Sequence, residues 1–192
     1  MKKSLLKQHV FFLLMLLTVA CRQSPEMHEG NSAVVDPVDN TAQPTIVYLV
    51  RHAEKETADL KDQNPGLSAK GLARAEVLGN LLKEQPIGAL YATKYIRTQH
   101  TLKPLSDSLS LEILQYDAND FVGLKERVLK SHQGQMVVVA GHSNTLLPIL
   151  EAFGAKRPVP DISEQEYDYL FKVTLAPDGK ATVETDHYGV NP

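Results

Sequence analysis

Two stretches downstream of residue 44 are unbroken runs of five apolar residues. They are Ile46–Val50 and Met136–Ala140, and both contain several β-branched side chains. An apolar run of this length without alternation is typical of a strand buried on both faces of a parallel sheet. Two further runs, Ile87–Ala92 and Leu111–Tyr116, predict shorter strands in the same sheet.

Segments with apolar residues at helical spacing alternate with these strands. The first begins after Ser68, a predicted N-cap, and ends at Gln85 before Pro86. Further helices are predicted over Lys94–Leu109, Phe121–His132 and Leu146–Phe153. Because Pro104 lies inside the second of them, we expect a kink or an early end there.

The end of the chain has a different pattern. Tyr167–Leu175 and Lys180–Thr185 flank Ala176-Pro177-Asp178-Gly179, which is typical of a hairpin of two antiparallel strands. Alternating strands and helices upstream indicate a parallel sheet with helices on both faces. The predicted fold is therefore an α/β three-layer sandwich that ends in an antiparallel hairpin.

The first 21 residues have the three parts of a secretory signal. Three lysines precede an apolar core, Val10–Leu17, which is too short to span a bilayer. Thr18–Cys21 follows and ends at the only cysteine in the chain. It resembles the lipobox of bacterial lipoproteins, with Thr18 where Leu is usual, and this implies lipidation of Cys21 and anchoring at the cell envelope, on the periplasmic or surface side. The alternative is an ordinary cleaved signal with Cys21 unmodified.

Residues 22–44 are predicted to be a disordered linker, because they combine prolines with polar residues and lack periodicity. The folded domain would then span residues 45–192. The net charge of the chain is −3, and removing residues 1–20 takes away three lysines and no acid, which makes it −6. This balance speaks against a nucleic-acid partner, and an anionic ligand would require a local cationic pocket.

Cationic and imidazole side chains follow three of the predicted strands. Arg51 and His52 follow the first strand, Arg97 lies early in the helix after the second, and His142 follows the fourth. The carboxyl ends of parallel strands meet at one edge of a sheet, so these four side chains are expected to converge. Two arginines suit a phosphoryl group, and a histidine can attack its phosphorus in line.

Three segments resemble motifs of the histidine phosphatase superfamily, which is also called phosphoglycerate mutase-like. They are Leu49–Lys55 (LVRHAEK), Thr93–Thr101 (TKYIRTQHT) and Gly141–Thr145 (GHSNT). They match, in order, the Arg-His motif, the second-arginine segment and the second-histidine motif of that family. The compact size is similar to that of the short branch, such as the phosphohistidine phosphatases.

The resemblance implies a role for each of these residues. His52 would be the nucleophile, and Arg51, Arg97 and His142 would form the phosphate pocket. Asn144 either contacts phosphate or caps the following helix. No metal or other cofactor is expected, since the arginines and the second histidine supply the positive field, and the sequence lacks the paired-histidine spacings of zinc sites.

The family also uses a general acid to protonate the leaving group, and in larger members this is a Glu after the third strand. Here Asp117 and Asp120 occupy that region. We predict Asp117, because Asp120 has a competing role as a helix cap. Glu54 and Asp161 are the next candidates.

The sequence thus predicts a metal-independent phosphatase acting on a phosphomonoester or a phosphohistidine, with a phosphorylated small molecule or phosphoprotein as substrate. One alternative is a degenerate member that binds a phosphorylated ligand without turnover. A phosphoglycerate mutase-type transferase is the other, although export would separate it from glycolytic substrates. Substrate specificity is expected to lie in Glu54–Gly66 and Gly154–Tyr167.

Overall fold

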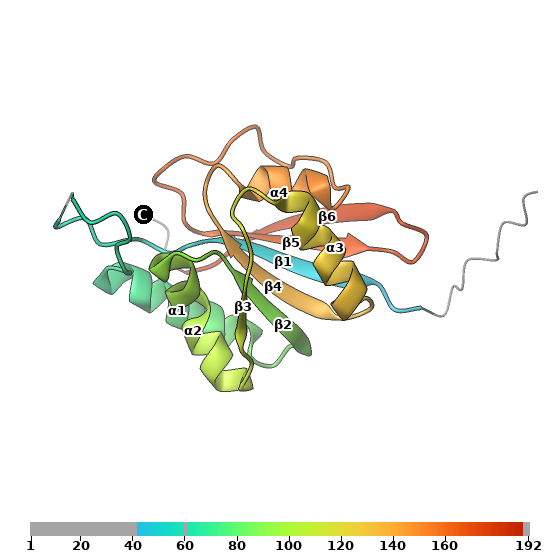
Figure 1. The fold of residues 1–192 in the computed structure, drawn as a ribbon, viewed down its shortest axis with the longest axis horizontal. Coiled ribbons are helices and arrows are strands. Elements are labelled where there is room, and N and C mark those ends of the chain that lie inside the picture. The colour runs from blue at the N-terminus through green and yellow to red at the C-terminus, as the bar shows by residue number, and fades with distance from the viewer. Residues whose placement is uncertain (1–41, 60, 190–192) are drawn as a thin grey trace, which may run out of the picture. The chain divides into compact units, whose positions relative to one another are not determined.

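The computed structural model describes residues 42–59 and 61–189, all within one compact unit, and its centre is a six-stranded sheet (Figure 1). The strands are β1 (Thr45–Arg51), β2 (Ile87–Ala92), β3 (Ile113–Gln115), β4 (Met136–Gly141), β5 (Tyr169–Leu175) and β6 (Ala181–His187). Their order in the sheet is β3-β2-β4-β1-β5-β6. The two continuous apolar runs are thus the adjacent central strands β4 and β1, as their burial requires.

The first four strands along the chain are parallel and the last two are antiparallel. β1 pairs with β4, β4 with β2, and β2 with β3 in parallel, whereas β5 lies antiparallel to β1 and β6 antiparallel to β5. In the connecting turn Gly179 has φ +82°, a conformation that glycine adopts without strain. The predicted mixed sheet with a C-terminal hairpin is confirmed.

Four helices cover the two faces of the sheet. They are α1 (Ala69–Leu82), α2 (Ile96–Leu109), α3 (Phe121–His132) and α4 (Leu146–Ala152). α1 and α2 lie on one face and α3 and α4 on the other (Figure 1). Each pair closes its own apolar core, the first around Leu78 and Leu105 and the second around Leu124 and Ile149. The predicted three-layer α/β sandwich is confirmed.

Side-chain caps set where two of the helices begin. The hydroxyl of Ser68 accepts a hydrogen bond from the Gly71 N–H at 3.2 Å, as predicted for an N-cap. Asp120 caps α3 in the same way, accepting from the Gly123 N–H at 2.8 Å. Asp120 therefore performs the predicted role of a helix cap in the structure.

Pro104 does not end α2 early, so that part of the expectation is wrong. The helix continues to Leu109. It packs against α1 at Gly79, where an added Cβ would lie 3.1 Å from the Pro104 Cβ. The close contact between the two helices stabilises the α2 backbone where the proline removes a hydrogen bond, and tertiary packing outweighs the local preference.

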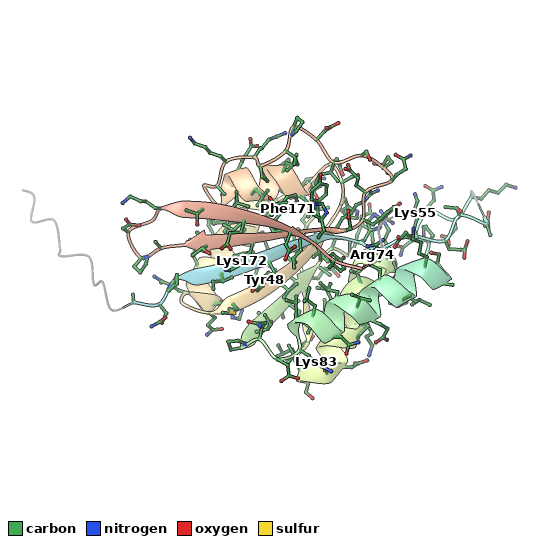
Figure 2. The ribbon with its side chains drawn as sticks, turned by 180° about the vertical axis from the view of Figure 1, so that it is seen from behind. Tyr48, Lys55, Arg74, Lys83, Phe171 and Lys172 are labelled. Carbon is green, nitrogen blue, oxygen red and sulfur yellow. The ribbon has the colours of Figure 1, made fainter. Side chains whose placement is uncertain are left out.

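A buried ion pair fixes the loop that follows β1. The Glu54 carboxylate accepts hydrogen bonds from Nε and Nη2 of Arg74, and Arg74 Nη1 donates to the Tyr188 carbonyl at 2.8 Å. Figure 2 shows Arg74 at the end of the domain where Lys55 also lies. Glu54 is thus committed to a structural contact that ties α1 and the chain after β6 to the loop beyond His52.

The predicted signal, Cys21 and the linker up to residue 41 lie outside the described residues, so the predictions of export and lipidation stay predictions. Within residues 42–59 and 61–189, no helix is long and apolar enough to span a bilayer.

Candidate active site

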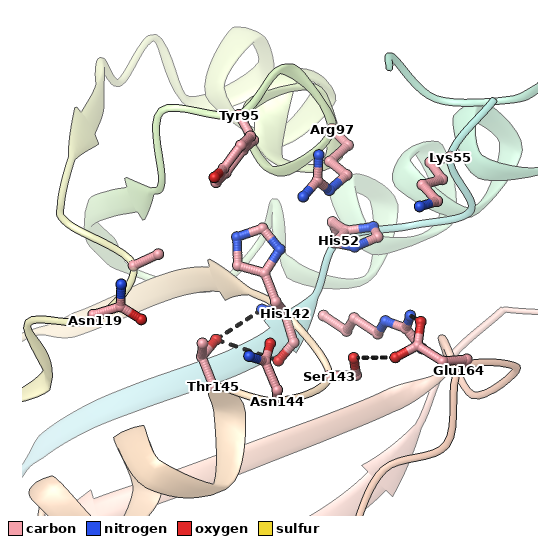
Figure 3. A pocket seen from close by; sticks show the side chains of 12 residues that line it. His52, Lys55, Tyr95, Arg97, Asn119, His142, Ser143, Asn144, Thr145 and Glu164 are labelled. Carbon is pink, nitrogen blue, oxygen red and sulfur yellow. Dashed lines mark hydrogen bonds and ion pairs between the residues drawn. The ribbon is translucent and has the colours of Figure 1, made fainter. Parts of the chain in front are cut away.

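A pocket opens at the carboxyl ends of β1, β2 and β4, the edge at which the sequence places its cationic residues. Its volume is about 330 Å³, near the lower end of the roughly 300–1,000 Å³ of small-molecule sites. Figure 3 shows the side chains gathered around it. The lining comprises Arg51, His52, Lys55, Tyr95, Arg97, Ala118, Asn119, His142, Ser143, Asn144, Thr145 and Glu164. The four residues expected to converge therefore do so.

His52 is held with one ring nitrogen free. Its side chain is buried, and Nδ1 lies 2.8 Å from the Ala53 carbonyl oxygen. A carbonyl can only accept, so Nδ1 carries the proton and the lone pair is on Nε2. Burial, together with the charges of Arg51, His142 and Arg97, lowers the pKa of His52 to about 3. The imidazole is therefore neutral at pH 7, as a nucleophile must be.

The backbone around His52 is fixed by two hydrogen bonds. The His52 N–H donates to the Gly141 carbonyl at 2.9 Å, which joins β1 to the end of β4. The Ala53 N–H donates to Thr101 Oγ1 at 2.8 Å, which joins the same loop to α2. The nucleophile candidate is therefore placed by rigid elements, which favours a precise line of attack.

Arg97 supplies a cation that no acid neutralises. Its guanidinium makes no hydrogen bond or ion pair with any residue of the described ranges, and its Nε is buried. The Cζ atom lies 4.4 Å from the centre of the Tyr95 ring, and burial lowers the pKa of Arg97. A stacked guanidinium with unsatisfied donors in a pocket is suited to bind an anion.

Arg51, by contrast, is largely engaged with a distant loop. Nη1 donates to the carbonyls of Ser163 and Glu166 at 2.8 and 2.9 Å, and Nη2 donates to the Glu164 carboxylate at 2.8 Å. The ring of Tyr167 covers the guanidinium, with Cζ 4.1 Å from the ring centre. The buried Nε has no partner among the described residues. Arg51 thus anchors loop 163–167 over the pocket and retains two N–H donors, one on Nε and one on Nη2.

His142 stands beside His52 at the end of β4. The two ring centres are 5.4 Å apart, and the ring of Tyr95 lies 5.3 Å away on the other side (Figure 3). Nε2 is 3.1 Å from Thr93 Oγ1. Burial and the charges of Arg97 and Arg51 lower the pKa of His142 to about 4. A second neutral imidazole therefore faces the pocket.

Glu164 is the one carboxylate among the described residues that line this pocket. One oxygen accepts from the Ser143 hydroxyl at 2.7 Å and the other from Arg51. The hydrogen bond from Ser143 and the charge of Arg51 lower the pKa of Glu164. The group is therefore ionised, and its side chain is 73% exposed at the rim.

The acids considered from the sequence lie elsewhere. Asp117 lines an adjoining pocket, where its carboxylate accepts from the Asn119 N–H at 2.8 Å. Asp120 caps α3, Glu54 is paired with Arg74, and Asp161 lines a third pocket. None of these four residues belongs to the lining of the pocket that holds His52. Asp117 as general acid stays a prediction.

Asn144 lines the pocket and does not cap the helix. The N-cap position of α4 belongs to Thr145, whose Oγ1 accepts from the His142 N–H at 2.9 Å. The side chain of Asn144 is exposed, and the phosphate contact predicted for it stays a prediction.

Among the described residues, no group of three or more metal-ligating side chains is present.

The sequence reasoning missed Tyr95, Tyr167 and Glu164. Each tyrosine covers one pocket arginine, and Glu164 accepts a hydrogen bond from Nη2 of Arg51. Only Tyr95 had a local signal, since it lies two residues before Arg97. Tyr167 and Glu164 reach the pocket from a loop more than 110 positions away from Arg51 in the sequence, and no short-range pattern marks such a contact.

The neutral state of both pocket histidines predicts a loss of stability at acidic pH. Their pKa values fall from 6.5 to about 3 and about 4 on folding. As the pH falls from 6.5 toward 4, the unfolded chain takes up protons that the folded chain does not. The free energy of unfolding should therefore decrease, by up to about 1.4 kcal/mol per pH unit for each histidine.

Urea unfolding between about pH 7 and pH 4.5 measures this dependence. The His52→Asn variant, which lacks one of the two groups, should lose stability less steeply over the same range. Equal slopes for the variant and the wild type would contradict a neutral, buried His52.

Comparisons with known proteins were consistent with this site. Residues 47–120 match the model of the histidine phosphatase superfamily (branch 1), a range that includes His52 and Arg97. No curated protein matches the sequence.

Several solved structures share the fold. One is the protein histidine phosphatase SixA complexed with tungstate, with 18% identity and a TM-score of 0.59 over 74% of this chain and 96% of the other. A putative phosphohistidine phosphatase SixA from Agrobacterium tumefaciens has 20% identity and a TM-score of 0.54, covering 78% and 99%. A putative alpha-ribazole-5'-P phosphatase from Escherichia coli has 16% identity and a TM-score of 0.57, covering 76% and 98%. The chain is thus similar to the histidine phosphatase superfamily over residues 47–120, and it shares its fold with these solved structures.

Proposed function

We propose that the protein is a phosphatase that transfers a phosphoryl group from its substrate to His52 and then to water. The observation that carries this proposal is the free Nε2 of His52, held beside an arginine, Arg97, whose guanidinium has no partner among the described residues. A nucleophile and a vacant cation in one small pocket are what phosphoryl transfer requires.

In the first step the Nε2 lone pair forms a bond to phosphorus, and the bond from phosphorus to the leaving group breaks. The electron pair of that bond stays on the leaving oxygen or nitrogen, which takes up a proton. In the second step water attacks phosphorus, the N–P bond breaks, and the electron pair returns to Nε2. One water is consumed, and inorganic phosphate is the product.

The charge that builds up on the phosphoryl oxygens would be met by Arg97, by the two remaining donors of Arg51 and by His142. The two guanidinium groups supply positive charge and hydrogen bonds at fixed positions, which is the main requirement of phosphoryl transfer. Independence from metal ions is therefore part of the proposal.

The leaving group must take up a proton when its bond to phosphorus breaks. Asp117 lies in the adjoining pocket, and Glu164 is ionised by its bonds to Ser143 and Arg51. A leaving group that needs little help from an enzymatic acid, such as an imidazole or an aryl alcohol, is favoured by this arrangement. We propose a phosphomonoester or a phosphohistidine as the substrate class.

Two features support phosphohistidine within that class. The domain shares its fold with a structure described as the protein histidine phosphatase SixA. The two loops expected to determine specificity each place one charged residue at the pocket, Lys55 and Glu164. An open rim with both charge signs suits a substrate site on a peptide.

A substrate panel on the purified full-length chain tests the function. It should contain p-nitrophenyl phosphate, sugar phosphates and a phosphohistidine peptide, each assayed for released phosphate with and without EDTA. We expect release from at least one member, unchanged by the chelator. Activity that disappears with EDTA and returns with a divalent metal ion would contradict the mechanism, and a His52→Ala preparation controls for contaminating phosphatases.

The same panel separates the two alternatives. A binding module would show saturable phosphate or phosphopeptide binding without release. A mutase would move the phosphoryl group between positions of a phosphorylated acceptor faster than it releases phosphate. The proposed phosphatase releases phosphate to water with no added acceptor.

A further inference from the structure

A row of buried hydroxyl groups leads away from His142. Nε2 of His142 lies 3.1 Å from Thr93 Oγ1, and Thr93 Oγ1 lies 2.8 Å from Thr98 Oγ1. Thr98 Oγ1 in turn lies 2.8 Å from the Tyr95 carbonyl and 3.2 Å from the Thr93 carbonyl. Both threonine side chains are fully buried, so no solvent competes for these bonds.

The two carbonyls decide the direction in which the protons point. A carbonyl oxygen can only accept, and each hydroxyl has one proton to give. With the Thr98 proton directed to the Tyr95 carbonyl, Thr93 must donate to Thr98. The Thr93 oxygen then accepts from the ring, which requires a proton on His142 Nε2.

We propose that Thr93 and Thr98 act as positioning residues that hold the proton of neutral His142 on Nε2, so that Nδ1 faces the phosphate pocket as a proton acceptor. Nδ1 has no hydrogen-bond partner within residues 42–59 and 61–189. Its ring lies between those of Tyr95 and His52, at the centre of the site (Figure 3).

This arrangement gives His142 a task beyond contact with phosphate, and that catalytic part rests on the proposed function. When a phosphoryl monoanion enters, its O–H bond can break and an N–H bond can form at Nδ1. The product is a dianion beside an imidazolium. The Nδ1–H of this imidazolium donates a hydrogen bond to a phosphoryl oxygen, and its Nε2–H donates one to Thr93 Oγ1. Thr93 accepts in both states, so the ring does not have to turn when it gains charge.

The other pocket histidine has the opposite arrangement. His52 carries its proton on Nδ1, towards the Ala53 carbonyl, and the Ala53 N–H is held by Thr101. Thr98 and Thr101 are three residues apart and therefore lie on one face of α2. This face would set the orientation of both histidines, one through Thr93 and the other through the backbone of Ala53.

Nitrogen-15 NMR of the histidine rings in the wild-type protein tests the assignment without any turnover. We expect His142 at neutral pH to show a protonated, pyrrole-type Nε2 and an unprotonated, pyridine-type Nδ1. Saturating inorganic phosphate should convert Nδ1 to the protonated type and leave Nε2 protonated. A wild-type His142 that already carries its proton on Nδ1 in the absence of phosphate would overturn the proposal.

Substitutions at Thr93 supply the second test. Thr93→Val removes the acceptor and should give a mixture of His142 tautomers, whereas Thr93→Ser should retain the wild-type pattern. Thr101→Val is the matched control, because it disturbs the His52 loop and should leave the His142 tautomer unchanged. If Thr93→Val folds and His142 keeps the wild-type tautomer, Thr93 and Thr98 have no positioning role.

We expect the Thr93→Val and Thr93→Ser variants to differ in kcat as they do in the His142 tautomer. Loss of a buried hydrogen-bond partner at Thr93 should reduce kcat by about 10- to 100-fold, with Thr93→Ser restoring most of it. If the wild-type protein shows no phosphatase activity, the proposed function fails. The NMR measurement then still decides which nitrogen of His142 carries the proton.

Discussion

Replacing His52 with alanine is expected to reduce phosphate release by on the order of 10⁴-fold or more, because no other described group could form the covalent intermediate at the same place. Loss of a nucleophile leaves only the binding and charge stabilisation of the pocket. His142 is not expected to substitute, since its ring centre lies 5.4 Å from that of His52 and its Nδ1 would therefore approach phosphorus from a different position. Steady-state phosphate release measures the loss.

His100 provides the matched control for this variant. It is an exposed histidine on α2, outside the pocket lining. His100→Ala should keep wild-type activity. If His52→Ala retained activity within tenfold of the wild type while folding normally, another residue would have to be the nucleophile.

The second large effect is expected at Arg97. Arg97→Ala should lower kcat/KM by about 10³-fold, the size seen when one preorganised donor to a transition-state oxyanion is removed. Arg97→Lys should recover only part of the loss, because an ammonium keeps the charge but not the planar fork. The absence of a carboxylate partner means that neither variant leaves an unpaired acid behind.

The control for Arg97 is Lys103→Ala on the same helix. Lys103 is an exposed cation that pairs with Asp107 four residues along the helix, and removing such a pair changes little. Its kcat/KM should remain within about twofold of the wild-type value. Loss of activity in Lys103→Ala comparable with that in Arg97→Ala would indicate that damage to α2, and not loss of the pocket cation, explains the result.

Local patterns were sufficient to predict most of the fold. The apolar run of β1 required burial on both faces, Ser68 supplied a hydroxyl where α1 needed a cap, and Phe121–His132 matched α3 over its whole length. The same reasoning brought Arg51, His52, Arg97 and His142 to one sheet edge, because the carboxyl ends of parallel strands must coincide there.

The errors have a common cause in tertiary contacts. Pro104 is tolerated because α1 packs against it at Gly79, and β3 is limited to three residues as an edge strand that pairs only with β2 in the described sheet. Glu164 was missed as a carboxylate of the pocket lining, since loop 163–167 folds back onto Arg51 from far along the chain. Sequence proximity to a strand end favoured Asp117, and nothing local marks Glu164.

The central claim is the covalent step on His52, and trapping of the phosphorylated enzyme tests it most directly. Full-length protein is mixed with a labelled substrate from the panel, quenched rapidly without acid, digested and mapped by mass spectrometry. We predict one phosphorylated residue, His52, with label that appears during turnover, decays when substrate is exhausted and is absent from His52→Ala. Label on His142, or turnover in which His52 never becomes labelled, would contradict the account.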